Sequence, residues 1–285
     1  MPTCHLDERA LFQLQGPEAE HFLQNVITTD LSALQNGECR PGALLTPQGK
    51  ILFDFLISRA GIDGLRIECR ADIAPDLVKR LTLYKLRAKV DISDIKQTVI
   101  AVSWETDSGS SDNESTLIDR RFPANVHVRR HYGDAPDASK GKTSWDELRI
   151  AHAVAESGSD FSLGDAFPHD VLYDQNGGVG LKKGCYVGQE VVSRMHHRGT
   201  ARRRLLIASG AADLPPQGTE LRADEKIVGA LGTVCGAKGL AIARIDRIKE
   251  AMDASIPVLA GQTAVTLAVP EWATFTFPEN KDGAD

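Results

Sequence analysis

Turn-forming glycines divide the C-terminal third of the chain into short segments that read as strands. After position 200 the glycines recur roughly every ten residues, which is typical of strands joined by tight turns. Such strands bury their apolar faces either by closing into a barrel or by packing as two sheets. We therefore predict a small β-barrel or sandwich built from RRLLIASG, GTELRADEKIVGALGTVCGAKGLAIARI, TAVTLAV and WATFTF.

The first half of the chain mixes strand and helix patterns. Residues 71–92 repeat Ile73, Leu77 and Leu81 at four-residue spacing, which predicts a helix. The turn signal Pro47-Gln48-Gly49 joins two apolar segments, and Pro17 suits the first position of a helix. These patterns predict an α+β unit with an antiparallel sheet. We expect strands in residues 9–15, 37–61, 63–70 and 120–134 and near residues 90–92, and helices after Pro17 and in residues 143–158.

Charge and cysteine content exclude several classes of protein. The net charge of −6 argues against broad binding to nucleic acid, which needs a basic surface. Five cysteines at wide spacings, with no CxxC, do not form a disulfide framework. No segment has the length of a membrane span and the N-terminus lacks an apolar leader, so we expect a cytoplasmic protein without membrane contact. The acidic, serine-rich residues 105–119 predict a solvated loop or a disordered insertion.

One cysteine has an unusual neighbourhood, in the sequence KGCYVGQE at positions 183–190. Apolar spacing predicts a helix after Gly188, so Cys185 lies just ahead of a helix N-terminus, where negative charge is stabilised. Lys182 and Lys183 add positive charge, which favours a reactive thiolate. The glycines Gly184 and Gly188 allow close backbone approach, and Gln189 and Glu190 can cap the helix or bind a ligand. A small core cysteine is the alternative.

The histidines nearby do not complete a known site. His196 and His197 lie too far along the helix to serve Cys185 as a base, so His152, His169 or another chain would have to supply one. Cys185, His196 and His197 match no known ligand spacing, and we expect no metal site formed by this chain alone. The thiolate of Cys185 could still be a single ligand to a cluster that a partner completes.

Two further sets of residues are candidates for binding. The residues from 182 to 204 hold seven basic side chains and one acid, giving +6 locally, and suggest either a solvated face or a site for an anionic ligand. Asp165, Asp170 and Asp174 lie in the turn-rich segment before the cysteine. A loop carboxylate can accept two adjacent N–H groups of a pterin, or simply cap a turn.

The motif KGCYVGQE resembles the K-G-C-[YF]-x-G-Q-E signature of the YgfZ family, relatives of the glycine-cleavage T protein. The segments LQGPEAEHFLQNVITTDL, LLTPQGKILFDFLI, SRMHHRGTARRRL and GLAIARID are also similar to the family pattern. The resemblance implies an α+β protein with a three-domain arrangement like that of the T protein. Its boundaries here would be residues 1–45 with 120–199 for a central folate-binding domain, 46–119 for a ferredoxin-like domain and 200–285 for the β-barrel.

The resemblance also implies a function. It indicates a protein that binds tetrahydrofolate or a derivative and supports assembly or repair of iron–sulfur clusters in [4Fe–4S] enzymes, including tRNA-modifying enzymes. We assign Asp170, Asp174, Arg194 and Arg198 to the folate site. Cys185 would be the functional residue, with Lys183, Gly184, Tyr186, Gly188, Gln189 and Glu190 around it, and a transient cluster is implied. Its partners would be iron–sulfur enzymes or cluster carriers, without direct nucleic-acid contact. We expect an accessory factor more than a classical enzyme.

Two alternatives remain open at the level of sequence. One is a folate-dependent aminomethyl or one-carbon transferase, whose chemistry needs a general acid or electrostatic partner beside the folate but no cysteine. The other is a non-catalytic scaffold whose basic segment docks an acidic protein or tRNA.

Overall fold

The computed structural model describes residues 1–95, 98–105 and 116–278. Two compact units account for these residues. The first unit comprises residues 1–142 and 176–193, and the second comprises residues 143–175 and 194–285, of which 279–285 lie outside the described residues. The acidic segment that we predicted to be a loop or a disordered insertion lies mostly outside the described residues. Its last residues form a strand, because Leu117 and Asp119 turn inward to buried partners.

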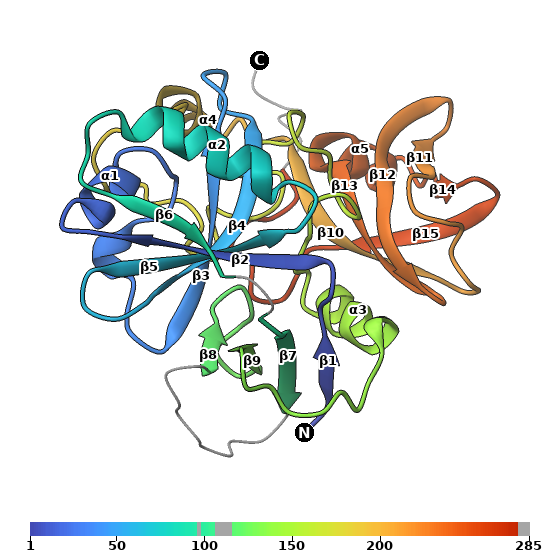
Figure 1. The fold of residues 1–285 in the computed structure, drawn as a ribbon. Helices are drawn as coiled ribbons and strands as arrows, with labels where there is room; N and C mark the ends of the chain where they lie inside the picture. Colours follow the sequence, from blue (N-terminus) through green and yellow to red (C-terminus); the bar gives the residue numbers. More distant parts are fainter. Residues whose placement is uncertain (96–97, 106–115, 279–285) are drawn as a thin grey trace. The chain divides into compact units, whose positions relative to one another are not determined.

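The first unit is built on a nine-stranded mixed sheet, seen at the left and bottom of Figure 1. Its order is β1-β7-β9-β8-β3-β4-β5-β2-β6, and the pairing of β3 with β8 is parallel whereas the others are antiparallel. The strands are β1 (Thr3–His5), β2 (Arg9–Gln15), β3 (Glu38–Leu45), β4 (Ile51–Arg59), β5 (Gly64–Arg70), β6 (Asp91–Asp94), β7 (Ile100–Glu105), β8 (Thr116–Asp119) and β9 (His127–Tyr132).

Helices α1 (Ala19–Gln24) and α2 (Ala74–Lys85) pack on one face of this sheet (Figure 1). Leu77 and Leu81 of α2 are fully buried against Ile57 and Ile67 of the strands, as the four-residue spacing predicted. The helix predicted to start at Pro17 begins two residues later, after a turn. A short 3-10 helix, η1 (Leu31–Ala33), begins at Asp30, whose carboxylate caps it by accepting from Ser32 N–H.

The other face of the sheet holds a buried ionic network. Glu68 on β5 is fully buried and accepts hydrogen bonds from Arg9, Arg130 and the Tyr132 hydroxyl. Burial raises the pKa of Glu68, but the charges of Arg130 and Arg9 more than offset this and leave it below its usual range. Arg130 also contacts Asp119 at 3.2 Å. The network joins strands β2, β5, β8 and β9, which are far apart in sequence, so these strands are held by charge pairing as well as by apolar packing.

The second unit contains the predicted barrel, at the right of Figure 1, and it is a closed barrel rather than a sandwich. Helix α5 (Ile245–Asp253) follows β13 and buries Ile245, Ile248 and Ala251 against the barrel core. This helix interrupts a region that we expected to be entirely strand-like. The strands, in the order β10-β13-β12-β11-β14-β15, are β10 (Arg203–Gly210), β11 (Glu220–Ala223), β12 (Lys226–Cys235), β13 (Lys238–Arg244), β14 (Val258–Ala260) and β15 (Thr263–Ala268).

The segment WATFTF is not a strand, contrary to the prediction. Thr274 N–H and its hydroxyl both donate to the side-chain oxygen of Gln175, and the Trp272 indole N–H donates to the carbonyl of His152. Phe275 and Phe277 pack against the barrel core. The alternation of polar and apolar residues therefore covers the barrel without joining its hydrogen-bond ladder.

Helix α3 (Lys142–Ala151) is attached to the barrel through Arg149, which is fully buried. Its guanidinium donates to Asp160 at 2.7 Å, to the carbonyl of Val154 and to the Thr233 hydroxyl on β12. Asp160 in turn accepts from Thr233 N–H at 2.7 Å. One charged cluster thus links the helix, the loop after it and a barrel strand.

No helix in the described part of the chain combines the length and the apolar content that crossing a membrane requires. The curled sheet followed by a barrel confirms the α+β class. The division into three domains with the boundaries given above stays a prediction.

Candidate functional site

Cys185 is the exposed member of the five cysteines, all of which lie among the described residues. Cys4, Cys39 and Cys69 are buried, and burial raises the pKa of the Cys69 thiol to about 12. Cys235 is half-buried. The alternative of a small core cysteine therefore does not hold for Cys185, whose thiol can be reached from solvent.

The loop that carries Cys185 is held by the buried ammonium of Lys183. It donates to the carbonyls of Ile27 at 2.7 Å and Thr29 at 2.8 Å, and lies 5.2 Å from the centre of the Tyr186 ring. Burial lowers the pKa of Lys183 to about 8, and the charge of Asp30 opposes this. Lys183 is thus an anchor of the loop, rather than only the source of positive charge that the sequence suggested.

A backbone contact continues this anchoring upstream of the cysteine. The Gly180 N–H donates to the Thr28 carbonyl, and the Thr28 hydroxyl donates to the Gly178 carbonyl at 2.6 Å. The segment before Cys185 therefore runs beside the connection between α1 and η1 and is fixed there. A reactive group on a fixed loop loses less conformational freedom when it binds a partner.

Gly188 closes the loop and leads into helix α4 (Gln189–Arg198). Its φ of +80° is left-handed, and a β-carbon at this position would lie 2.6 Å from the Thr46 carbonyl oxygen. Gly184 has no such crowding within 4 Å. Of the two glycines that we predicted to allow close backbone approach, Gly188 is therefore the one that makes such an approach. Its contact places the start of α4 against the β3–β4 turn.

Helix α4 follows the predicted position closely. It begins at Gln189, four residues after Cys185, and places Glu190 in its first turn. Val192 is its fully buried residue, whereas Val191 and Met195 are half-buried. Arg194 and Arg198, which we assigned to a folate site, are exposed near its end.

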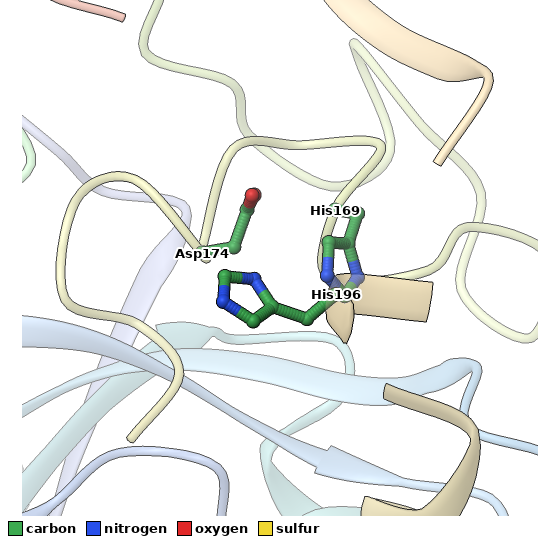
Figure 2. A group of neighbouring side chains, drawn as sticks. All are labelled: His169, Asp174 and His196. Atoms are coloured by element: carbon green, nitrogen blue, oxygen red, sulfur yellow. The ribbon is translucent and has the colours of Figure 1, made fainter. Parts of the chain in front are cut away.

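A second cluster, within the second unit, consists of His169, Asp174 and His196, and we call it the histidine–aspartate cluster. One potential ligand atom from each residue lies within 4.8 Å of those of the other two. Figure 2 shows the imidazoles and the carboxylate gathered around a shared space, with His196 reaching in from α4. The centres of the two imidazole rings are 6.3 Å apart.

The turn-rich segment before residue 176 fixes the first two members of the cluster. Successive turns are closed by Leu172 N–H donating to the His169 carbonyl and Gln175 N–H donating to the Leu172 carbonyl. Leu172 adopts a φ of +62°. His169 is fully buried, and burial lowers the pKa of its imidazole to about 4. It is therefore neutral at physiological pH.

Arg204 on β10 positions both of these residues. Its guanidinium donates to the two oxygens of Asp174 at 2.8 and 3.0 Å, and also to the His169 carbonyl at 2.9 Å. The same guanidinium lies 4.9 Å from the centre of the Phe275 ring. The basic run at 202–204 therefore contributes at least one residue to the interior of the second unit rather than to a solvated face.

Asp170 is the other carboxylate that we assigned to folate. It is almost fully buried and accepts from Phe167 N–H at 3.1 Å, with Arg203 at 3.6 Å. Burial raises its pKa to about 6, although Arg203 opposes the rise. The turn-capping alternative thus describes what Asp170 does in this structure.

His169 was considered in the sequence only as a base for Cys185, and its place beside Asp174 and His196 was not predicted. His196 is 27 residues away on a different element, so no spacing rule links the three. The sequence indicated only that His169 and Asp174 lie in the same turn-rich segment.

Comparison with known proteins identifies relatives over most of the chain. The family described as "CAF17, C-terminal beta-barrel domain" matches residues 202–275. The iron-sulfur cluster assembly factor IBA57 homolog, mitochondrial, of Neurospora crassa is 30% identical over 255 residues, covering 78% of this chain and 58% of that protein. The chain thus spans less than two thirds of this relative's length.

The mammalian relatives match over more of their length. Iron-sulfur cluster assembly factor IBA57, mitochondrial, is 28% identical in Mus musculus, covering 95% of this chain and 85% of that protein, and also 28% identical in Homo sapiens. Among solved structures, glycine cleavage system aminomethyltransferase T from Bartonella henselae is similar in fold. Its TM-score is 0.68 at 13% identity, covering 95% of this chain and 86% of that one. The resemblance first seen at KGCYVGQE is confirmed: the chain belongs to the IBA57/CAF17/YgfZ family, whose fold is related to that of the glycine-cleavage T protein.

Proposed function

We propose that this protein is an accessory factor in the assembly or repair of iron–sulfur clusters, acting through the Cys185 thiol. One observation carries the proposal: Cys185 is the exposed cysteine, on a loop fixed by Lys183 and by Gly188. The relatives are named as iron–sulfur cluster assembly factors, which supports the same interpretation. In this proposal the thiolate contacts a cluster as one ligand, and a partner iron–sulfur protein supplies the others.

The cargo and compartment follow from the same chemistry. A single thiolate cannot hold a cluster alone, since clusters take four protein ligands in the usual case. The cluster is therefore cargo, shared with a carrier or with a [4Fe–4S] enzyme, including enzymes that modify tRNA. An exposed free thiol suits a reducing compartment, for which we propose the cytoplasm, although the relatives are named as mitochondrial.

The test replaces Cys185 in cells that depend on this protein. Cys185→Ala and Cys185→Ser are expected to lower the activity of a [4Fe–4S] enzyme, such as a tRNA methylthiotransferase, while the amount of that enzyme stays constant. Cys235→Ala, at the half-buried cysteine, is the matched control and should leave the activity unchanged. If Cys185→Ala restores full enzyme activity to cells lacking the protein, the thiol has no part in the mechanism.

We further propose that the protein binds a reduced folate. The carboxylates assigned to the pterin are engaged by protein donors, because Asp174 accepts from Arg204 through both oxygens and Asp170 accepts from Phe167 N–H. Arg204 would have to give way before Asp174 could accept two adjacent N–H groups of a pterin.

A pocket beside the cysteine loop offers a second placement for folate. Its volume is about 590 Å³, within the usual range for ligand sites. Val187 of the motif lines it together with Phe22 and Tyr84, and Arg87 is a further lining residue. Aromatic walls suit a planar pterin, and a cation suits the glutamate tail.

Calorimetry with tetrahydrofolate separates the two placements. Tyr84→Ala should weaken binding if the pocket holds folate, and Asp174→Asn should weaken it if the carboxylate does. Absence of heat for the unaltered protein would remove folate from the proposal.

A folate-dependent aminomethyl transferase is the second candidate, and the fold likeness to aminomethyltransferase T favours it. This chemistry does not need Cys185. Product formation from an aminomethyl-lipoyl carrier and tetrahydrofolate, retained in Cys185→Ala, would support this candidate over the cluster-assembly proposal.

A further inference from the structure

We propose that the histidine–aspartate cluster of His169, Asp174 and His196 binds one divalent first-row transition-metal ion. The three residues come from two elements of the second unit and bring two imidazoles and one carboxylate to a common space, as Figure 2 shows. Cys185 is not a member of this set. The proposal is therefore independent of the thiol chemistry and can fail or hold separately from it.

The strongest argument is the state of His169. Its side chain is fully buried, and within the described residues neither ring nitrogen has a hydrogen-bond partner. Buried polar groups in folded proteins are almost always partnered, so each exception calls for an explanation. A metal ion bound by one of the nitrogens supplies the missing interaction, and neutral imidazole is a common metal ligand.

The carboxylate of Asp174 is oriented by hydrogen bonds and can still bind a metal ion. Arg204 donates to both carboxylate oxygens, and the Gln175 side-chain amide donates to one of them at 2.9 Å. A carboxylate has roughly four acceptor directions, so one remains for a metal ion. Hydrogen bonds of this kind orient carboxylate ligands in metal sites. Because Arg204 also donates to the carbonyl of His169, one side chain positions two of the proposed ligands.

His196 supplies the adjustable ligand. It is exposed in the last turn of α4, whereas His169 is buried. The ligand atoms lie within 4.8 Å of one another, and a tetrahedral ion with bonds near 2.1 Å needs them about 3.4 Å apart. A change of rotamer at the exposed His196 can bring its ring nitrogen closer to the other two ligand atoms.

The ligand set determines which ions fit. Imidazole nitrogens suit zinc, iron and copper, and two histidines with one carboxylate leave positions open for water or a substrate. Hard ions such as Mg²⁺ and Ca²⁺ prefer oxygen ligands and are not expected here. Zn²⁺ and Fe²⁺ share the required chemistry, and zinc binds more tightly to a given site of this type.

The experiment uses the full chain without a histidine tag, stripped with a chelator. Titration with Co²⁺, followed by visible absorbance, should show one ion per chain, and Zn²⁺ should displace it. His196→Ala is expected to weaken Co²⁺ binding about tenfold or more, a loss of the size seen when a metal site loses even a supporting contact. His197→Ala, an exposed neighbour outside the cluster, is the matched control and should bind as the unaltered protein does.

Further variants make the outcome decisive. His169→Gln should also lose Co²⁺ binding, with circular dichroism confirming that the variant folds, whereas Cys185→Ala should retain it. Equal Co²⁺ affinity in His196→Ala and the unaltered protein would overturn the proposal, as would absence of binding in the unaltered protein. One Zn or one Fe per chain in protein purified from cells, lost in His196→Ala, identifies which ion the site takes.

Discussion

Gly49 and Gly188 meet backbone to backbone: a β-carbon on Gly188 would lie 3.1 Å from the α-carbon of Gly49. Both residues have a φ of +80°. Gly49 lies in the turn between β3 and β4, and Gly188 closes the cysteine loop. Two motifs that are 139 positions apart in the sequence therefore touch through their glycines, and this contact sets where α4 begins.

Gly188→Ala is expected to destabilise the protein by about 2 kcal/mol or more. The left-handed φ alone costs an L-residue about 1–2 kcal/mol, and the added methyl group would also meet the Thr46 carbonyl oxygen. Gly177→Ala is the matched control, because Gly177 has a φ of +81° but nothing within 4 Å of an added β-carbon. Urea denaturation should show the larger loss for Gly188→Ala, and equal losses would contradict the role of the close contact.

Lys183 should make the unfolding free energy depend on pH in the alkaline range. Burial lowers its pKa in the folded protein to about 8, whereas an unfolded chain has a lysine pKa of about 10.4. Between these values the unfolded state binds more protons, so the unfolding free energy rises with pH, by about 1.4 kcal/mol per pH unit at most. Below pH 8 both states hold the proton and this contribution is constant.

Denaturation curves from pH 7 to 10 test this dependence. Lys183→Met should remove the rise, and the same substitution at the exposed Lys182 should keep it. A rise of the same size in Lys183→Met would assign the effect to other groups.

Cysteine labelling should be selective in the native protein. Iodoacetamide is expected to modify Cys185 first, because Cys4, Cys39 and Cys69 are buried, and burial raises the pKa of Cys39 and Cys69. Mass spectrometry of digested protein measures the order of modification, and labelling in urea should reach all five cysteines. Early modification of Cys39 or Cys69 under native conditions would contradict the described burial.

The buried network at Glu68 should be costly to break. Arg130→Met removes a fully buried partner of both Glu68 and Asp119, and leaving buried carboxylates without this charge is expected to cost about 3–5 kcal/mol. Arg222→Met, at the exposed pair with Glu220, should change the unfolding free energy by less than about 1 kcal/mol. Chemical denaturation compares the two, and similar values would mean that the buried network does not stabilise the sheet.

The sequence could predict elements whose signal is local. The apolar spacing of Leu77 and Leu81 and the turn at Pro47 to Gly49 correspond to α2 and to the β3–β4 connection. The barrel followed from glycine spacing, but α5 was missed. Ile245 and Ile248 recur at the three-residue spacing of a helix, whereas the glycine turns on both sides had suggested strands throughout. WATFTF was wrongly expected to be a strand, since only tertiary contacts with Gln175 and His152 decide its backbone partners.

The candidate site was predictable to a similar extent. The motif singled out Cys185 and the helix after it, and the structure adds that the thiol is exposed. The burial of Lys183 against the carbonyls of Ile27 and Thr29 could not be read from sequence, because these residues lie more than 150 positions away. The same holds for Arg204, which looked like part of a basic surface and instead pairs with Asp174.

The Arg149 cluster has a practical consequence for dissecting this protein. The hydrogen bonds of Arg149 span α3, the loop at 154–160 and Thr233 in the barrel. A fragment cut at residue 200 would leave Thr233 facing an empty position where Arg149 and Asp160 belong. An isolated barrel intended for biophysical work should therefore keep residues 143–175, even though sequence families recognise the barrel from residue 202 onward.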